Sequence, residues 1–262
     1  GLRLIAEGSE EAVGPRFSKR AIIAVAALFA AVNAFNAMGS WGTFLKFMNP
    51  TSFGESDPLF GFDISFYVFT LPFVKYIQSW LQGVLMVTLM GTLVSYFMTR
   101  SLSLEGTKLT ASLRARFHLS LLGSLFILTW GAGYWLARYE LLFSPTGVVF
   151  GAGYTDVNIL LPAFKILTAA AAAAAVLLLM NFYKPMWKMS AVLIGGLLLL
   201  GWVSRSFVPG LVQQYRVKPN EYELEKPFLD YHLDYTRRAF GLNDVRTIDV
   251  TPENEVTAEE LL

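Results

Sequence analysis

The sequence contains no cysteine among its 262 residues. This absence excludes disulfide bonds, thiolate catalysis, iron–sulfur clusters and cysteine-rich zinc sites. It leaves the compartment open, because proteins outside the bacterial cytoplasm often have no cysteine either. Histidine is nearly as scarce, since the chain has only His118 and His232.

Charged residues are also scarce. They make up 16% of the chain, whereas soluble domains carry about 25%. Hydrophobic residues make up 54%, and a surface that faces lipid instead of water produces this imbalance. The net charge of +1 gives no basic face, which excludes nucleic acid as a partner. Acidic residues gather after Pro219, and the rest of the chain is basic.

Long apolar runs are what the sequence has in abundance. The clearest is Tyr76–Thr99, which is uncharged over more than the roughly 20 residues that cross a bilayer core. A soluble protein with such helices in its core would need polar faces that this chain cannot supply. The sequence therefore predicts an all-α, polytopic helical bundle in a membrane, with spans at about 21–38, 76–99, 119–137, 166–183 and 189–212.

Basic residues predict the orientation of these spans. They precede the first span and recur in the 100–116 and 184–188 loops, and cytoplasmic loops carry an excess of Lys and Arg. Segment 1–20 is thus expected to be a truncated cytoplasmic piece, and 21–212 the membrane region. Residues 213–262, together with the 41–75 and 138–165 loops, are expected outside. They would begin an extracytoplasmic domain.

Proline and glycine mark the predicted ends of several elements. Pro72 should begin the helix that enters the membrane after the aromatic, interfacial segment from Asp57 to Phe73, since proline suits the first turn of a helix. Pro227 should likewise begin a helix in the tail, which Gly241 ends. Beyond it, the alternating residues 245–250 predict a short strand, and 257–260 resemble a capping box that opens another helix.

Polar residues inside the spans are few. Asn33 and Asn36 lie three apart in the first span, on one helix face, with Ser40 one turn further on. Such side chains join helices through hydrogen bonds, and we favour that role over a substrate or ion site. No ionisable residue lies near the centre of a span, which weakens the interpretation as a pump. Arg138 and Glu140 flank the outer end of the third span and are expected to anchor it there.

His118 is the only candidate for a cofactor ligand. It lies at the inner end of the third span, where it could ligate the metal of a haem or chlorophyll, although an ordinary interfacial histidine explains it better. His232 is predicted on the opposite side of the membrane. A bis-histidine haem within this chain is therefore excluded if the predicted topology holds.

The glycine-containing stretch Gly147–Pro162 superficially suggests a phosphate-binding loop. It has no following Lys-Ser/Thr pair and no strand–helix context, so that interpretation fails. A tight outer loop in which Asp156 accepts hydrogen bonds from local backbone amides is the better prediction. Asp57 and Asp63 are expected on the same side, and with Asp156 they could form a carboxylate cluster for Ca²⁺, which prefers oxygen ligands.

Three stretches, 53–73, 139–167 and 217–242, resemble uncharacterised protein family 0182, which comprises large integral membrane proteins of bacteria. The resemblance implies a multi-helix N-terminal membrane region followed by a large extracytoplasmic domain. This chain would hold the later spans and the first elements of that domain, in a bacterial cytoplasmic (inner) membrane. The family has no established reaction or catalytic residues, so none can be transferred.

The expected function is therefore a non-enzymatic one. We expect a scaffold or accessory subunit that anchors an extracytoplasmic domain or a larger membrane complex. Its partners would be the lipid bilayer and other membrane subunits, and the run Ala169–Ala175 would let a neighbouring helix approach closely. The alternative is a transporter or channel component with Asn33 and Asn36 near a pathway. No catalytic constellation is visible, and Ca²⁺ is the only ligand with candidate residues besides the cofactor that His118 could ligate.

Overall fold

The computed structural model describes residues 19–105, 108–183, 187–246 and 248, and it is nearly all helical. A two-stranded antiparallel hairpin, β1 (Leu102–Glu105) and β2 (Lys108–Ala111), pairs Leu102 with Ala111 and joins α3 to α4. The α-helices of the described chain are α1 (Lys19–Gly39), α2 (Trp41–Met48), α3 (Leu71–Met98), α4 (Leu113–Ala137), α5 (Leu161–Met180), α6 (Trp187–Trp202), α7 (Val208–Val212) and α8 (Glu221–Ala239).

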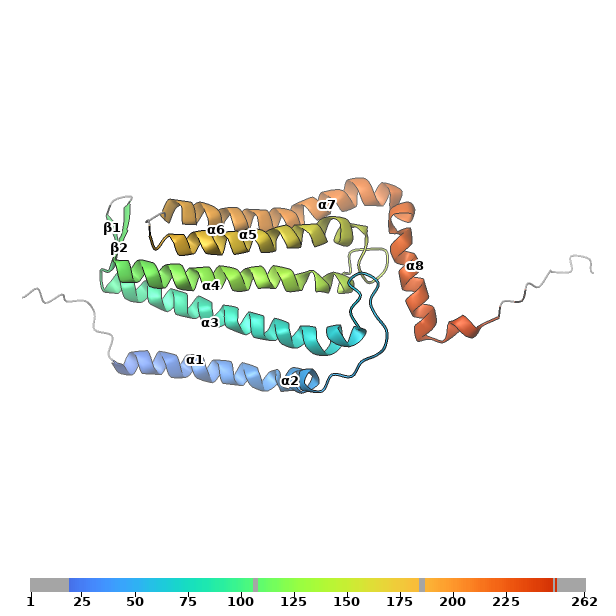
Figure 1. The fold of residues 1–262 in the computed structure, drawn as a ribbon, viewed down its shortest axis with the longest axis horizontal. Helices are drawn as coiled ribbons and strands as arrows, with labels where there is room; N and C mark the ends of the chain where they lie inside the picture. The colour runs from blue at the N-terminus through green and yellow to red at the C-terminus, as the bar shows by residue number, and fades with distance from the viewer. Residues whose placement is uncertain (1–18, 106–107, 184–186, 247, 249–262) are drawn as a thin grey trace, which may run out of the picture.

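The helices α3, α4, α5 and α6 lie side by side as a bundle, with α1 at its edge beyond α3 (Figure 1). The β-hairpin lies at one end of this bundle, which we call the hairpin end. At the other end, α2, the loop before α3 and the loop between α4 and α5 come together, and α8 runs across them (Figure 1). We call this the α8 end. The β-hairpin of the 100–116 loop thus lies at one end, and the loops before α3 and before α5 lie at the other, as the sequence predicts.

Four helical segments are long and apolar enough to cross a membrane, judged by length and composition. They are Phe66–Met98, Leu113–Ala137, Asp156–Met180 and a stretch within Lys188–Ala239. They correspond to the last four predicted spans. In the described part of α1, Ala26–Gly39 forms a shorter apolar helix. The first span, predicted at 21–38, therefore stays a prediction.

The closest helix packing joins α4 to α5 through small residues. A Cβ added to Gly131 would lie 2.9 Å from Cβ of Ala171, and one added to Gly123 would lie 2.7 Å from a methyl carbon of Leu178. The buried Ser124 hydroxyl donates to the Ala175 carbonyl at 2.9 Å. The alanine run thus lets a neighbouring helix approach, as predicted. A buried core of Ile127, Ala171, Ala174, Ala175, Leu178 and Leu197 surrounds this contact.

Prolines shape the helices at the α8 end. Each π-helical turn of the described chain is followed at once by an X–Pro pair, and the residue before the proline donates its N–H to the carbonyl five residues back. A proline ring clashes with the carbonyl four residues back and offers no N–H, so a wider turn accommodates it. These turns are Phe66–Thr70, Asp156–Leu160, Val203–Phe207 and Gln213–Val217, before Pro72, Pro162, Pro209 and Pro219.

One of the two predicted helix starts is wrong. The α-helix α3 begins at Leu71 with Pro72 in its first turn, as predicted, although helical backbone from Ile64 and a π-helical turn precede it. In the tail, α8 begins at Glu221 and Pro227 lies in its interior. The start signal there is Pro219 in the preceding 3-10 turn, followed by Glu221 and Glu223, whose charges favour a helix N-terminus.

The end of the tail helix is predicted correctly. Gly241 follows α8 with a left-handed backbone, φ +64°, which glycine adopts without strain. The strand expected at 245–250 is absent where it can be judged, since Val245, Arg246 and Ile248 are not in a strand. Its other residues, the 257–260 capping box and nearly all of segment 1–20 lie outside the described residues.

Candidate functional site

Buried carboxylates gather at the α8 end. The first is Asp57, whose side chain is 8% exposed. It accepts hydrogen bonds from the backbone N–H groups of Leu59, Phe60 and Phe62 at 2.6–2.9 Å. The Tyr67 hydroxyl donates to it at 2.7 Å. Asp57 thus folds its own loop onto the π-helical turn that leads into α3.

Asp63 organises the adjacent part of the same loop. Its carboxylate accepts from the Ser52 hydroxyl and from the backbone N–H groups of Ser65, Gly54 and Phe53 at 2.8, 3.0 and 3.2 Å. The hydrogen bonds from Ser52 and Ser65 hold the pKa of Asp63 well below its usual value of 3.8. Asp63 therefore stays ionised at physiological pH as a loop-forming acceptor.

Asp156 is 1% exposed and lies at the start of the helix that leads into α5. The Gly153 N–H donates to its carboxylate at 3.0 Å, and the Thr146 hydroxyl donates at 3.3 Å. The prediction of bonding to local backbone is confirmed. Within the described residues, however, no group of three or more His, Cys, Asp or Glu side chains is placed to hold a metal ion. Asp57, Asp63 and Asp156 are therefore not assembled into one ligand set.

The residue that joins Asp156 is Glu225 of α8, which is only 2% exposed. The Tyr154 N–H lies 3.1 and 3.2 Å from its two carboxylate oxygens. A Cβ added to Gly153 would lie 3.0 Å from Oε2 of Glu225. Both carboxylates thus lie against Gly153, Asp156 from the same loop and Glu225 from α8. We call them the Asp156–Glu225 pair.

Sequence reasoning missed Glu225 because it is one of many acids in a polar tail. A usable signal was present nevertheless. Glu225 lies three residues before Phe228, and residues three apart share a helix face. Phe228, Tyr231 and Tyr235 recur at roughly helical spacing, and the same period places Glu225 on their face of the helix.

The environment of Glu225 disfavours its ionised form. Burial raises the pKa of Glu225 above its usual 4.5, the Tyr154 N–H opposes this, and the charges of Asp156 and Glu221 raise it further. In the described chain, neither member of the pair takes part in a salt bridge. The pair can therefore hold a proton at a pH where an exposed glutamate would have lost it.

A second set of contacts holds the far half of α8. The Tyr235 hydroxyl donates to the Ser56 carbonyl, and an Arg238 guanidinium nitrogen lies 3.5 Å from the Glu55 carboxylate. Thr155 adds a hydrogen bond to Gln213, just before α8, at 2.6 Å. The helix α8 is thus fixed to two loops, the one before α3 and the one before α5.

Arg138 and Glu140 make separate contacts, because residues two apart on a helix do not face each other. The Arg138 guanidinium lies over the rings of Trp135 and Tyr139, 3.3 and 4.5 Å from their centroids. Glu140 instead forms an ion pair with Lys75 of α3. Glu140 thus ties the α8 end of α4 to α3, whereas these two contacts of Arg138 lie within its own segment.

The remaining candidates make simpler contacts. The His118 Nδ1 atom is hydrogen-bonded to the Tyr96 hydroxyl at 2.6 Å, which links α4 to α3 near the hairpin end. The Asn33 amide donates to the Phe29 carbonyl at 2.8 Å, and the Ser40 hydroxyl donates to the Asn36 carbonyl at 3.4 Å. These α1 contacts stay within one helix. The cofactor role of His118 and the polar site at Asn33 and Asn36 stay predictions.

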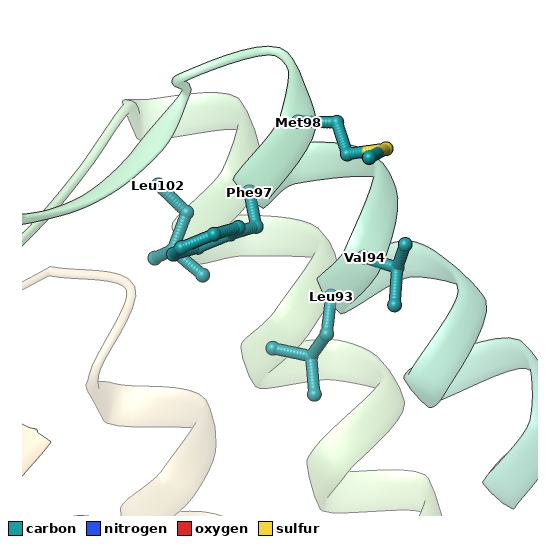
Figure 2. A pocket seen from close by; sticks show the side chains of 5 residues that line it. All are labelled: Leu93, Val94, Phe97, Met98 and Leu102. Atoms are coloured by element: carbon teal, nitrogen blue, oxygen red, sulfur yellow. The ribbon is translucent and has the colours of Figure 1, made fainter. Parts of the chain in front are cut away.

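A groove at the hairpin end has an entirely apolar lining. Figure 2 shows its side chains, which come from the last turns of α3 and from β1. Arg100 takes a left-handed backbone, φ +53°, at the turn between these elements. Such a lining offers no group for polar recognition or catalysis. The lining residues are Leu93, Val94, Phe97, Met98 and Leu102.

Comparison with known proteins places the chain in a family. The family model described as "Uncharacterised protein family (UPF0182)" matches residues 6–262. A UPF0182 protein of Pelotomaculum thermopropionicum is 36% identical over 249 residues, which are 95% of this chain and 27% of that protein. One from Thermobifida fusca is 37% identical over 226 residues, which are 86% of this chain and 22% of that protein.

A UPF0182 protein of a Synechococcus species is 36% identical and is covered to 28% of its length. The chain thus spans about a quarter of the length of these curated relatives. No solved structure matches the chain.

Proposed function

The chain belongs to the uncharacterised protein family UPF0182, and we propose that it is a membrane scaffold that anchors and orients an extracytoplasmic domain. In this proposal the bundle α3–α6 lies in the bilayer and residues 213–262 begin that domain. The attachment of α8 across the end of the bundle sets the angle at which the domain leaves the membrane.

The observation that carries the proposal is that Glu225 of α8 is buried against the loop before α5. A flexible linker would leave this charged side chain in water, because burying a carboxyl group costs free energy. Here Glu225 is bound by the Tyr154 N–H, and Tyr235 and Arg238 bind the loop before α3. Two separate attachments make α8 a rigid joint.

The placement in the membrane is part of the proposal. Four apolar helices support a lipid bilayer as the surroundings. Arg100, Arg114 and Arg116 lie at the hairpin end, which favours that end as cytoplasmic in a bacterial inner membrane. Segment 1–20 would then be cytoplasmic and the tail extracytoplasmic. Partner membrane subunits would dock on the exposed apolar faces of α1 and α3.

The scaffold proposal is tested on the full-length protein by loosening α8. We expect Glu225→Ala combined with Arg238→Ala to leave membrane insertion intact and to lower the yield of subunits that co-purify in mild detergent. Arg237→Ala is the matched control, because Arg237 is exposed on the same helix turn and has no described contact. Full-length protein that purifies alone and homogeneous, before any substitution, would count against a role as accessory subunit. An unchanged set of subunits in the double variant would count against α8 as the joint.

The alternative, a transporter or channel component, needs Asn33 and Asn36 beside a pathway. Their described contacts lie within α1. No contact therefore favours the alternative over the scaffold.

A further inference from the structure

We propose that the Asp156–Glu225 pair is a proton-operated latch, which holds the start of α8 on the bundle while the pair retains a proton and releases it when both carboxyl groups ionise. This inference deepens the proposed function and rests on it, because it concerns the regulation of the same joint.

The geometry gives the latch its two halves. Asp156 belongs to the bundle, where Gly153 and Thr146 bind it. Glu225 belongs to α8, and its contact with the bundle is the Tyr154 N–H. Asp156 and Glu225 are 1% and 2% exposed, so both carboxyl groups are shielded from bulk water.

The charges around the pair do not neutralise it. Glu221 on α8 adds a third negative charge that acts on Glu225. From the turn before α8, the Arg216 guanidinium lies 5.7 Å from the ring centroid of Tyr154, not in an ion pair with either carboxylate. Lys218 and Lys226, the nearest cations along the chain, form no salt bridge within the described residues.

Ionising two adjacent buried carboxyl groups without a cation costs free energy, because each negative charge raises the proton affinity of the other group. One retained proton removes this repulsion, because only one of the two groups then carries a charge. In the docked state the pKa of Glu225 is raised above 4.5, chiefly by burial. Docking is therefore fully favourable below that usual value and is weakened as the pH rises through the raised value.

The test measures docking with spin labels in the full-length protein in lipid nanodiscs. This chain has no cysteine, so cysteines can be placed singly for labelling. Val148→Cys puts one label on the loop before α5 and Tyr231→Cys puts the other on α8, both at exposed positions. We expect one short distance at pH 5.5 and an added longer population at pH 8.5. The ratio of docked to released protein should fall by up to about tenfold per pH unit.

Glu225→Gln mimics the protonated side chain and should keep the short distance at both pH values. Asp230→Asn is the matched control, since Asp230 is exposed on α8 without a described contact, and it should behave as the parent does. If Glu225→Gln fails to fold, Asp156→Asn tests the other half of the latch and should also abolish the pH dependence.

Several results would overturn the latch. A short distance at both pH values in the parent would leave α8 as a joint but remove the proton as its control. If a chelator releases α8 and high pH does not, a bridging cation and not a proton holds the pair together. Loss of the short distance at every pH, in the parent and in Glu225→Gln, would instead sink the proposed function itself.

Discussion

Gly153 is the residue that both buried carboxylates touch. Its N–H binds Asp156, and its open side faces Glu225. The other aspartates act in a similar way on a smaller scale, because Asp57 and Asp63 each collect backbone N–H groups of their own loop. The sequence predicts this role for Asp156 but not the partner, since a residue's hydrogen bonds to nearby backbone follow from local spacing and its distant neighbours do not.

Gly153→Ala should weaken the docking of α8. The added Cβ would lie 3.0 and 3.2 Å from the carboxylate oxygens of Glu225, and overpacking of this kind costs about 1–3 kcal/mol. Thermal unfolding of the purified protein, or exchange of the Tyr154 amide hydrogen, measures the effect. Gly210→Ala is the control, because a Cβ there meets nothing within 4 Å. Equal losses in both variants would show that the effect is not specific to Glu225.

The pairing of α4 with α5 shows how much a helix sequence reveals. The alanine run and the glycines of α4 predict close approach, and the structure confirms it at Gly131 and Ala171. The prolines also predict where the helices widen. Each of Pro72, Pro162, Pro209 and Pro219 follows a π-helical turn. Proline tolerates the first turn of a helix, which is where Pro72 lies in α3, whereas Pro227 lies in the interior of α8.

Gly131→Ala should destabilise the α4–α5 contact. Its new Cβ would lie 2.9 Å from Cβ of Ala171, and we expect a loss of about 1–3 kcal/mol in the free energy of unfolding. Adding Ala171→Gly should restore part of that loss by removing the clash. Gly91→Ala, where a Cβ meets nothing within 4 Å, should be neutral or stabilising by up to about 1 kcal/mol. A Gly131→Ala variant as stable as Gly91→Ala would contradict the packing.

The whole molecule separates two ends of different character. The hairpin end carries basic residues and an apolar groove, and the α8 end carries the buried carboxylates, the π-helical turns and the aromatic rings packed around Tyr139. Large apolar side chains along α3 remain exposed, among them Met90 and Val94 at 51% and 54%. Such a surface suits lipid or neighbouring helices better than water.

The orientation of the two ends can be checked on intact cells. With no cysteine in this chain, Tyr231→Cys on α8 and Thr110→Cys in the hairpin provide single labelling sites at exposed positions. We expect an impermeant thiol reagent to label Tyr231→Cys and to label Thr110→Cys only after the cells are opened. Labelling of Thr110→Cys in intact cells would reverse the proposed topology.

The sequence by itself determined the helical class, four helices that are long and apolar enough to cross a membrane, and the glycine that ends α8. These features follow from local composition and period, which a chain carries wherever it folds. Only the tertiary structure decided that Glu225 meets Asp156, because Glu225 and Tyr154 are 71 residues apart and burial of a charge depends on what packs over it. The joint between bundle and tail is therefore a property of the fold.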